Sequence, residues 1–288
     1  MTRKTLLGGV AAAGLAVGVA GVGFADIRTG DSLVINGDIA MITEAPAPEF
    51  LQDRVSTIYS GWVFRTDETR AMQADDFDNP AMLYTEQGLT AFETVMGTEG
   101  NSCATCHENA ESLAGVRATY PKWDAEHGAV QTVEMQIIEC QTERMGMAEP
   151  YGYDSQAMRN MASLIASVSR GQTVNVAIDG PVADTWALGE EIYYTKYGQL
   201  ELSCADCHEN NYGNLIRADH LSQGQINGFP TYRLKNANVN SVHGRFRGCV
   251  RDTRGETFAV GSPEFVALEL YVASRGNGLT VEGPSVRN

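Results

Sequence analysis

Three features are scarce in this sequence: long apolar runs, basic residues and, in its last part, methionine. After the first 25 residues no apolar run is long enough to cross a bilayer, which predicts a mature chain without a membrane anchor. The formal net charge of −15 argues against nucleic acid or an anionic lipid surface as a partner. The final methionine is Met161, so a metal centre built from later residues has no thioether ligand of its own.

The beginning of the chain is the one strongly apolar part. Arg3 and Lys4 form a basic start, residues 6–24 are apolar and rich in Gly and Ala, and small residues precede an expected cleavage after Ala25. This pattern is typical of a secretory signal peptide rather than of a transmembrane helix. We therefore expect residues 1–25 to be removed and the mature protein to be periplasmic, in a compartment where cysteines readily form disulfides.

The six cysteines are not spaced as a simple disulfide framework. Cys103 to His107 is CATCH and Cys204 to His208 is CADCH, and each is the Cys-x-x-Cys-His pattern that attaches c-type haem. Two thiols bond the haem vinyl groups, and the adjacent histidine, His107 or His208, binds the iron from one side. The predicted attachment residues are Cys103, Cys106, Cys204 and Cys207. The sequence therefore predicts two covalently bound haems, because a redox dithiol or a zinc site leaves both histidines unexplained.

The two motifs belong to a longer internal repeat. Gly97 matches Gly198 at the 101-residue offset that separates the motifs, and "CHEN" occurs in both copies. Further along the chain the offset becomes 109, so that Cys140 falls on Cys249. Both copies end in a helical pattern followed by "SRG". These matches indicate a tandem duplication with eight residues inserted in the second copy.

The repeat predicts a mainly α fold with two tandem cytochrome c-like domains, residues 81–173 and 174–288, whose long loops wrap the haems. Apolar residues at helical spacing predict a closing helix near residues 158–168. Ser262-Pro263 is typical of the start of its counterpart, which Gly276 would end. Residues 26–80 form an N-terminal extension outside the repeat, and its segment "EAPAPEF" suits an extended arm.

Each haem iron needs a second axial ligand, usually Met or His. The second copy offers His220, His243 and Cys249, and the first offers His127, Cys140 and several methionines. Only the two cysteines occupy equivalent positions in the repeat, so we favour thiolate ligation of one iron by Cys140 and of the other by Cys249. The alternative is a disulfide between them, which would require their Cα atoms to lie within about 7 Å.

The sequences around these two cysteines carry opposite charge. The window 134–145 has a formal charge of −2, whereas the aligned window 243–254 has +3 because Arg245 and Arg247, with two further arginines, flank Cys249. Guanidinium groups bind oxyanions and favour a thiolate. We therefore expect electron transfer at the first haem and a site for a small oxyanion at the second. A plainer interpretation pairs one or two of these arginines with haem propionates.

The mature chain resembles the SoxA family, the haem subunits of SoxAX sulfur-oxidation cytochromes. The resemblance rests on "SGWVFRTDETRAMQADDFDNPAML", on both haem motifs and on "GRFRGC". It implies an L-cysteine S-thiosulfotransferase that attaches thiosulfate to a cysteine of a SoxYZ-type carrier protein and releases two electrons. It also implies a heterodimer with a SoxX-type monohaem cytochrome. In this family Cys249 would be a catalytic haem ligand found as a persulfide, Arg245 the substrate arginine, Arg247 its support and Cys140 the thiolate ligand of the first haem.

Two other functions remain open at this point. A thiosulfate dehydrogenase would couple two thiosulfate ions to tetrathionate without a carrier protein. A non-catalytic dihaem electron carrier would use the arginines as a docking patch and would not turn over sulfur compounds.

Overall fold

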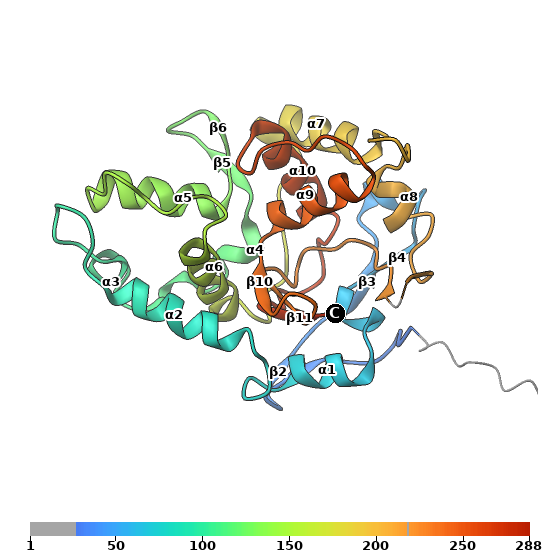
Figure 1. Ribbon diagram of the computed structural model, residues 1–288, viewed down its shortest axis with the longest axis horizontal. Helices are drawn as coiled ribbons and strands as arrows, with labels where there is room; N and C mark the ends of the chain where they lie inside the picture. Colours follow the sequence, from blue (N-terminus) through green and yellow to red (C-terminus); the bar gives the residue numbers. More distant parts are fainter. Residues whose placement is uncertain (1–26, 218) are drawn as a thin grey trace, which may run out of the picture.

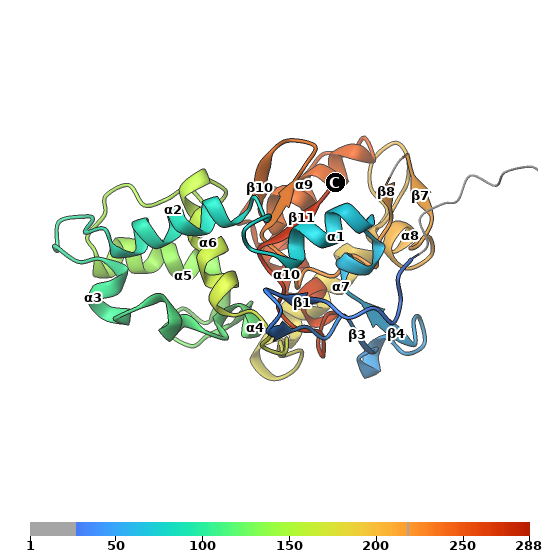
Figure 2. The same ribbon diagram turned by 90° about the horizontal axis from the view of Figure 1, so that it is seen from below.

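The computed structural model describes residues 27–217 and 219–288, so the predicted signal peptide, residues 1–25, lies outside the described residues. The described chain is mainly α, as expected, but it also contains short strands of two or three residues that the sequence patterns did not indicate. None of the helices in the described ranges has the length and apolar character needed to span a bilayer. Figures 1 and 2 show two lobes, with α2, α3, α5 and α6 in the first and α7, α8, α9 and α10 in the second.

The first lobe contains the first haem motif. Its elements are α2 (Met82–Glu93), α3 (Cys103–His107), the 3-10 turn η3 (Ala110–Leu113), α4 (Val116–Thr119), the hairpin of β5 (Lys122–Asp124) and β6 (Ala129–Gln131), α5 (Val133–Glu139), the π-helical turn η4 (Cys140–Arg144) and α6 (Gln156–Val168). Thr132 caps α5 and Ser155 caps α6, each accepting a backbone N–H from three residues ahead. Such side-chain caps stabilise a helix start by about 1 kcal/mol.

The second lobe repeats the order of the main helices and of one strand pair around the second motif, with an additional hairpin and a final strand. Its elements are the 3-10 turn η5 (Gly180–Val182), α7 (Ala183–Tyr194), α8 (Cys204–His208), the hairpin of β7 (Leu215–Ile216) and β8 (Asp219–His220), β9 (Thr231–Arg233), β10 (Asn238–Asn240), α9 (Val242–Asp252), α10 (Pro263–Ser274) and β11 (Ser285–Arg287). Strand β9 lies between β10, antiparallel to it, and β11, parallel to it. The predicted start of α10 is confirmed, because Ser262 is its N-cap and Pro263 its first residue.

Equivalent glycines allow the main helices of each lobe to cross closely. A Cβ atom on Gly88 of α2 would collide with the carbonyl oxygen of Asn160 in α6. A Cβ atom on Gly189 of α7 would collide with the carbonyl oxygen of Ala267 in α10. Any side chain at either position would force the backbone to shift, so both helix crossings require glycine. The repeat in the sequence therefore corresponds to a repeat in helix packing.

The N-terminal extension is folded onto the second lobe rather than being a free arm. Its elements are β1 (Val34–Ile35), β2 (Ile39–Ala40), β3 (Glu44–Pro46), the 3-10 turn η1 (Glu49–Leu51), β4 (Thr57–Tyr59), the 3-10 turn η2 (Gly61–Phe64) and α1 (Asp67–Ala74). The segment expected to be an extended arm pairs as β3 with β4. Gln223 of the second lobe accepts the backbone N–H of Tyr59 (2.8 Å) and donates to the carbonyl of Thr57 (3.0 Å). The expectation of an arm was wrong because apolar side chains such as Leu51 and Ile58 pack into a core.

Candidate functional site

Each haem motif forms a single short helix with the same cap. Ser102 caps α3 and Ser203 caps α8, and each forms a capping box with the third helical residue, Thr105 or Asp206. Because helical residues three and four apart share a face, both thiols and the following histidine of each motif project to one side of the helix. That arrangement fits two covalent bonds to one haem edge and an imidazole beneath the iron.

His208 is prepared as a metal ligand by the loop that follows it. Its Nδ1 donates to the carbonyl oxygen of Ser222 (2.7 Å), which leaves Nε2 with a free lone pair. Burial lowers the pKa of His208 to about 4, so the ring is neutral at physiological pH. Gly224 has φ +79°, and a Cβ there would lie 2.9 Å from the imidazole. The loop therefore holds the ring in a fixed orientation, as a hydrogen bond to the outer nitrogen does for metal-binding histidines in general.

The residue after His208 is tied to the closing helix. Arg275, at the end of α10, is 1% exposed and donates to Glu209 Oε1 over 2.6 Å. Its guanidinium also lies 4.3 Å from the ring centroid of Tyr193 in α7. This buried pair fixes the end of α8 against both main helices of the second lobe.

The structure places each unpaired cysteine beside its own haem motif. Burial, and then the nearby Cys140, raise the pKa of Cys103 to about 11. Burial, and then the nearby Cys249, raise the pKa of Cys204 to about 12. Electrostatic influence of this kind requires short separations, so the pairing runs within the lobes. No disulfide joins Cys140 to Cys249 among the described residues, and their positions beside different motifs argue against that alternative.

Cys140 lies in an apolar setting at the end of α5. Gln136 donates from Nε2 to its Sγ at 3.7 Å. Burial raises the pKa of Cys140, the hydrogen bond from Gln136 lowers it, and Glu139 raises it again. Arg245 lies one helical turn before Cys249. The equivalent position before Cys140 is occupied by Gln136, not by an arginine. This environment suits a structural ligand better than a site for an anionic substrate.

The four arginines expected around Cys249 do not all face it. Arg245 precedes Cys249 by four residues in α9, so both lie on one side of the helix. Burial raises the pKa of Cys207 and lowers that of His208, and the charge of Arg245 then lowers both, so its guanidinium lies beside the second haem motif. Arg247 points to the first lobe instead, with Nη2 3.6 Å from Asp154 Oδ2.

The remaining two arginines of the predicted nest lie at the surface. Arg251 contacts only its neighbour Asp252, at 3.2 Å, and three quarters of its side chain is exposed. Arg254 is exposed at the turn after α9, with φ +63°. Charge counted along the sequence therefore overstated the positive charge that α9 presents to Cys249.

Two arginines from outside α9 contribute positive charge that the sequence reasoning missed. Arg65, in the N-terminal extension, donates from Nη2 to the carbonyl of His220 (2.6 Å) and lies 3.6 Å from Asp219 Oδ1. Burial lowers the pKa of Arg65, Asp219 raises it, and the charges of Arg233 and Arg245 lower it again. The Arg65 Nε atom is buried without a hydrogen-bond partner among the described residues.

Arg233 of β9 belongs to the same charged group. Its Nε donates to the backbone oxygen of Asn288 over 2.9 Å. Burial and the charge of Arg245 lower the pKa of Arg233, while Asp219 and Cys249 raise it. Arg233 and Arg245 thus come together near Cys249 from β9 and α9, and Arg65 joins them from the N-terminal extension. Three guanidinium groups, with Asp219 and Asp252 nearby, form a basin suited to an oxyanion.

The other candidate axial ligands are engaged elsewhere. Both ring nitrogens of His243 have partners, since Nδ1 accepts from Gly261 N–H (3.0 Å) and Nε2 faces Glu269 (3.1 Å). Met158 and Met161 are buried in the apolar core of the first lobe. His127 lies in the exposed turn between β5 and β6, bonded to Asp124. Among the candidates described, Cys140 and Cys249 are the ones whose charge acts on a motif cysteine.

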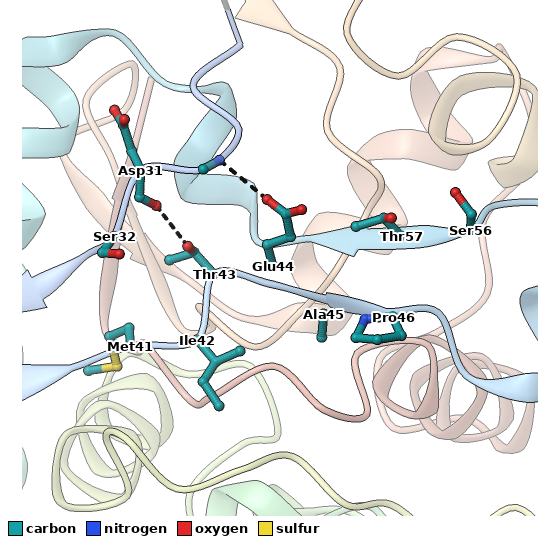
Figure 3. A pocket seen from close by; sticks show the side chains of 11 residues that line it. Asp31, Ser32, Met41, Ile42, Thr43, Glu44, Ala45, Pro46, Ser56 and Thr57 are labelled. Carbon is teal, nitrogen blue, oxygen red and sulfur yellow. Dashed lines mark hydrogen bonds between the residues drawn. The ribbon is translucent and has the colours of Figure 1, made fainter.

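A large open cleft lies away from this site. A hollow of about 530 Å³ in the N-terminal extension is lined by β3 and by the segments that flank it. Figure 3 shows the side chains that line it. Glu44 accepts the backbone N–H of Gly30 (3.3 Å), and the Thr43 hydroxyl donates to the carbonyl of Asp31 (3.0 Å). Its lining contains neither cysteine nor histidine nor a basic residue, so the cleft offers none of the groups used by the candidate site.

Comparison with known proteins agrees with this geometry. A family model described as the SoxA/TsdA cytochrome c domain matches residues 87–174. The L-cysteine S-thiosulfotransferase subunit SoxA of Rhodovulum sulfidophilum is 58% identical over 99% of this chain and 100% of its own length. The protein of the same name from Paracoccus pantotrophus is 56% identical over 98% of this chain and 97% of its own. The crystal structure of SoxXA from P. pantotrophus aligns with a TM-score of 0.88, covering 91% of this chain and 100% of that chain.

The fold and the motif helices define a cytochrome of the c type, with covalently bound haem. Within that class, the chain belongs to the SoxA family of L-cysteine S-thiosulfotransferase subunits. The resemblance seen in the sequence is thereby confirmed.

Proposed function

We propose that this chain is a dihaem cytochrome that conjugates thiosulfate to a cysteine of a SoxYZ-type carrier protein in the periplasm. Its haem domains would be residues 81–173 and 174–288, preceded by the extension 26–80, and its partner a SoxX-type monohaem cytochrome. The observation that carries the proposal is that Cys249 shares one face of α9 with Arg245 beside the second motif. The names of the relatives support the reaction, and the similarity to a SoxXA crystal structure supports the partner.

The two haem sites would differ in role because their cysteines differ in setting. We propose that Cys103, Cys106 and His107 hold the first haem with Cys140 as its thiolate ligand. Cys204, Cys207 and His208 would hold the second with Cys249. When bound, the haems supply one-electron steps and carry electrons away from the sulfur chemistry. Because its cysteine lies in an apolar and acidic setting, the first haem would serve electron transfer alone.

Arg245 has an electrostatic task in this reaction. Thiosulfate is a dianion, so it is repelled by a thiolate at Cys249. Two unit charges about 4 Å apart interact by roughly 4 kcal/mol at an effective dielectric of 20. A guanidinium fork offsets this repulsion, binds the sulfonate oxygens in a bidentate way and leaves the outer sulfur facing Cys249. Arg65 and Arg233 would add to the positive field, and Arg247, paired with Asp154, would support Arg245 by holding α9 in place.

The sulfur chemistry can be written in two balanced steps. In the first, Cys249 Sγ bonds to the outer sulfur of thiosulfate, giving Cys249–S–S–SO3⁻ with the loss of two electrons. In the second, the carrier thiolate attacks that outer sulfur, and Cys249 leaves as a thiolate. The product is carrier–S–S–SO3⁻, and the two electrons pass onward to the partner cytochrome. A covalent intermediate of this kind divides one difficult step into two easier ones.

Electron release in the presence and absence of the carrier tests this function. We expect the heterodimer to reduce an acceptor cytochrome over repeated turnovers only when thiosulfate and carrier are both present, with two electrons released for each carrier adduct found by mass spectrometry. A carrier whose reactive cysteine is replaced by serine is the matched control and should give no more than the two electrons per enzyme of the first step. Tetrathionate formation without the carrier would instead identify a thiosulfate dehydrogenase, and no turnover at all would leave an electron carrier.

A further inference from the structure

Helix α5, which continues into the turn η4 that begins at Cys140, and helix α9, which contains Cys249, start against neighbouring residues. Their N-caps, Thr132 and Ser241, occupy equivalent positions in the repeat, 109 residues apart. The hydroxyls of Thr132 and Tyr153 share a hydrogen bond of 2.8 Å. Ser241 Oγ donates to Asp154 Oδ1 over 2.7 Å. Residues 153 and 154 therefore hold the beginnings of both helices, although each helix belongs to a different lobe.

A buried acid–base cluster adds a second connection between the same helices. Glu134 and His243 are also equivalent positions, each six residues before the cysteine of its helix. His243 Nδ1 accepts the Gly261 N–H (3.0 Å), so its proton is on Nε2, which donates to Glu269 Oε2 (3.1 Å). Arg117 donates to the other oxygen, Glu269 Oε1, at 3.3 Å. Glu134 is 6% exposed, and its Oε2 atom has no hydrogen-bond partner among the described residues.

The charges of this cluster balance only if Glu134 carries a proton. Burial raises the pKa of Glu269, but the hydrogen bond from His243 and the charge of Arg117 outweigh it and keep that pKa below its usual range. Burial, and then the negative charge of Glu269, raise the pKa of Glu134. Tyr153, the other titratable group facing the cluster, has a pKa raised well above its usual value by burial and then by Glu134. With His243 neutral, Arg117 and Glu269 then form the charged pair of this cluster among the described residues.

The cluster lies at the starts of both helices, so a small movement of its side chains would shift both cysteines. A helix rises about 1.5 Å per residue, so six residues place each cysteine roughly 9 Å along a rigid rod from the cluster. We propose that Glu134, His243 and Glu269 are positioning residues that couple the placement of Cys140 to that of Cys249. This inference rests on the proposed ligation of both haems by thiolates. A disturbance at the start of one helix is then felt at both haem sites, because buried packing transmits strain.

Replacement of His243 tests the coupling. His243→Asn keeps an acceptor for Gly261 but cannot reach Glu269, whereas His243→Gln keeps a donor near the position of Nε2. Low-spin EPR of the intact heterodimer would be recorded for both variants. The signal that loses its thiolate character in Cys140→Met identifies the first haem. We expect His243→Asn to shift the signals of both haems and His243→Gln to restore the wild-type spectrum in part. Asp252→Asn, an exposed position on the same helix, is the control and should shift neither.

A shift of the second haem signal alone would overturn the proposal, because it would show that His243 acts only on its own helix. If the proposed ligation is wrong, the wild-type protein will lack two thiolate-type signals. This failure can therefore be distinguished from a failure of the coupling. If His243→Asn does not accumulate, Glu134→Gln decides the question, because an amide imitates the protonated acid without being able to ionise.

Glu134→Gln has two expected results. Wild-type signals of both haems should change as the pH is raised through the ionisation of Glu134, whose pKa burial holds above its ordinary value, and the variant should show no such change. Since the folded protein binds this proton more tightly than the unfolded chain, wild-type stability falls as pH rises from about 4.3 to the raised pKa. The variant should therefore gain stability relative to wild type at neutral pH and not at pH 4. The same pH dependence in both proteins would overturn the proposal.

Discussion

Cys249→Ser is expected to lower carrier-dependent electron release by at least about a hundredfold, because removing a nucleophile removes the covalent step it makes. A serine hydroxyl is a far weaker nucleophile than a thiolate at neutral pH and does not form the sulfur–sulfur bond. Both haems should remain attached, since their covalent bonds use other cysteines, and the intact mass checks this directly. The signal of the second haem should lose its thiolate character.

The contrary outcome for this variant is also specific. A rate close to that of wild type, with two haems attached and the second haem signal changed, would show that Cys249 is a ligand without a part in the sulfur chemistry. The Arg245→Ala variant would then show whether Arg245 still acts in the sulfur chemistry or whether the chain serves only as an electron carrier.

Arg245→Ala is expected to reduce the rate by about a hundredfold, the usual effect of removing a group that stabilises developing or approaching negative charge. Cys249 should stay in place, so the EPR signal of the second haem should keep its thiolate character. Arg245→Lys should recover only part of the rate, because an ammonium group supplies the charge without the bidentate fork. Rates of thiosulfate-dependent electron release at several thiosulfate concentrations would separate weaker binding from slower reaction.

Arg247→Ala is the matched control on the same helix. Its side chain is half exposed and faces Asp154 on the other side of α9, and such pairs contribute at most about 1 kcal/mol. We therefore expect a much smaller loss than for Arg245→Ala. Equal losses in the two variants would show that general positive charge on α9 matters, rather than a group aimed at Cys249.

Spacing in the sequence was sufficient to predict the parts of the site that lie on one helix. Two Cys-x-x-Cys-His motifs predicted two equivalent haem-attachment sites, each of which forms a short capped helix, and the 109-residue offset placed Cys140 and Cys249 at equivalent positions. Both are local patterns, in which residue spacing and helix geometry determine which side chains share a face. The start of α10 at Ser262-Pro263 was predictable for the same reason.

The parts that depend on tertiary contacts were not predictable in this way. A count of arginines along α9 could not tell which of them faces Cys249, because Arg245 and Arg247 point to different lobes. Arg65 comes from an extension outside the repeat, and only its packing against the second lobe brings it near the site. The sequence did contain one indication of Arg233. This residue aligns with Asp124 at the 109-residue offset, so a positive residue replaces a negative one, as it does around the cysteines.

Intact-protein mass spectrometry, followed by mapping of the Cys249 peptide, is the most direct test of a dihaem chain whose Cys249 handles sulfur. We expect the mature protein, made in cells that attach haem, to carry two haems. After incubation with thiosulfate and an electron acceptor, but without carrier, we expect thiosulfate-derived sulfur on Cys249 and none on Cys140. A mass with one haem, or a Cys249 peptide that never gains sulfur, would contradict the proposal.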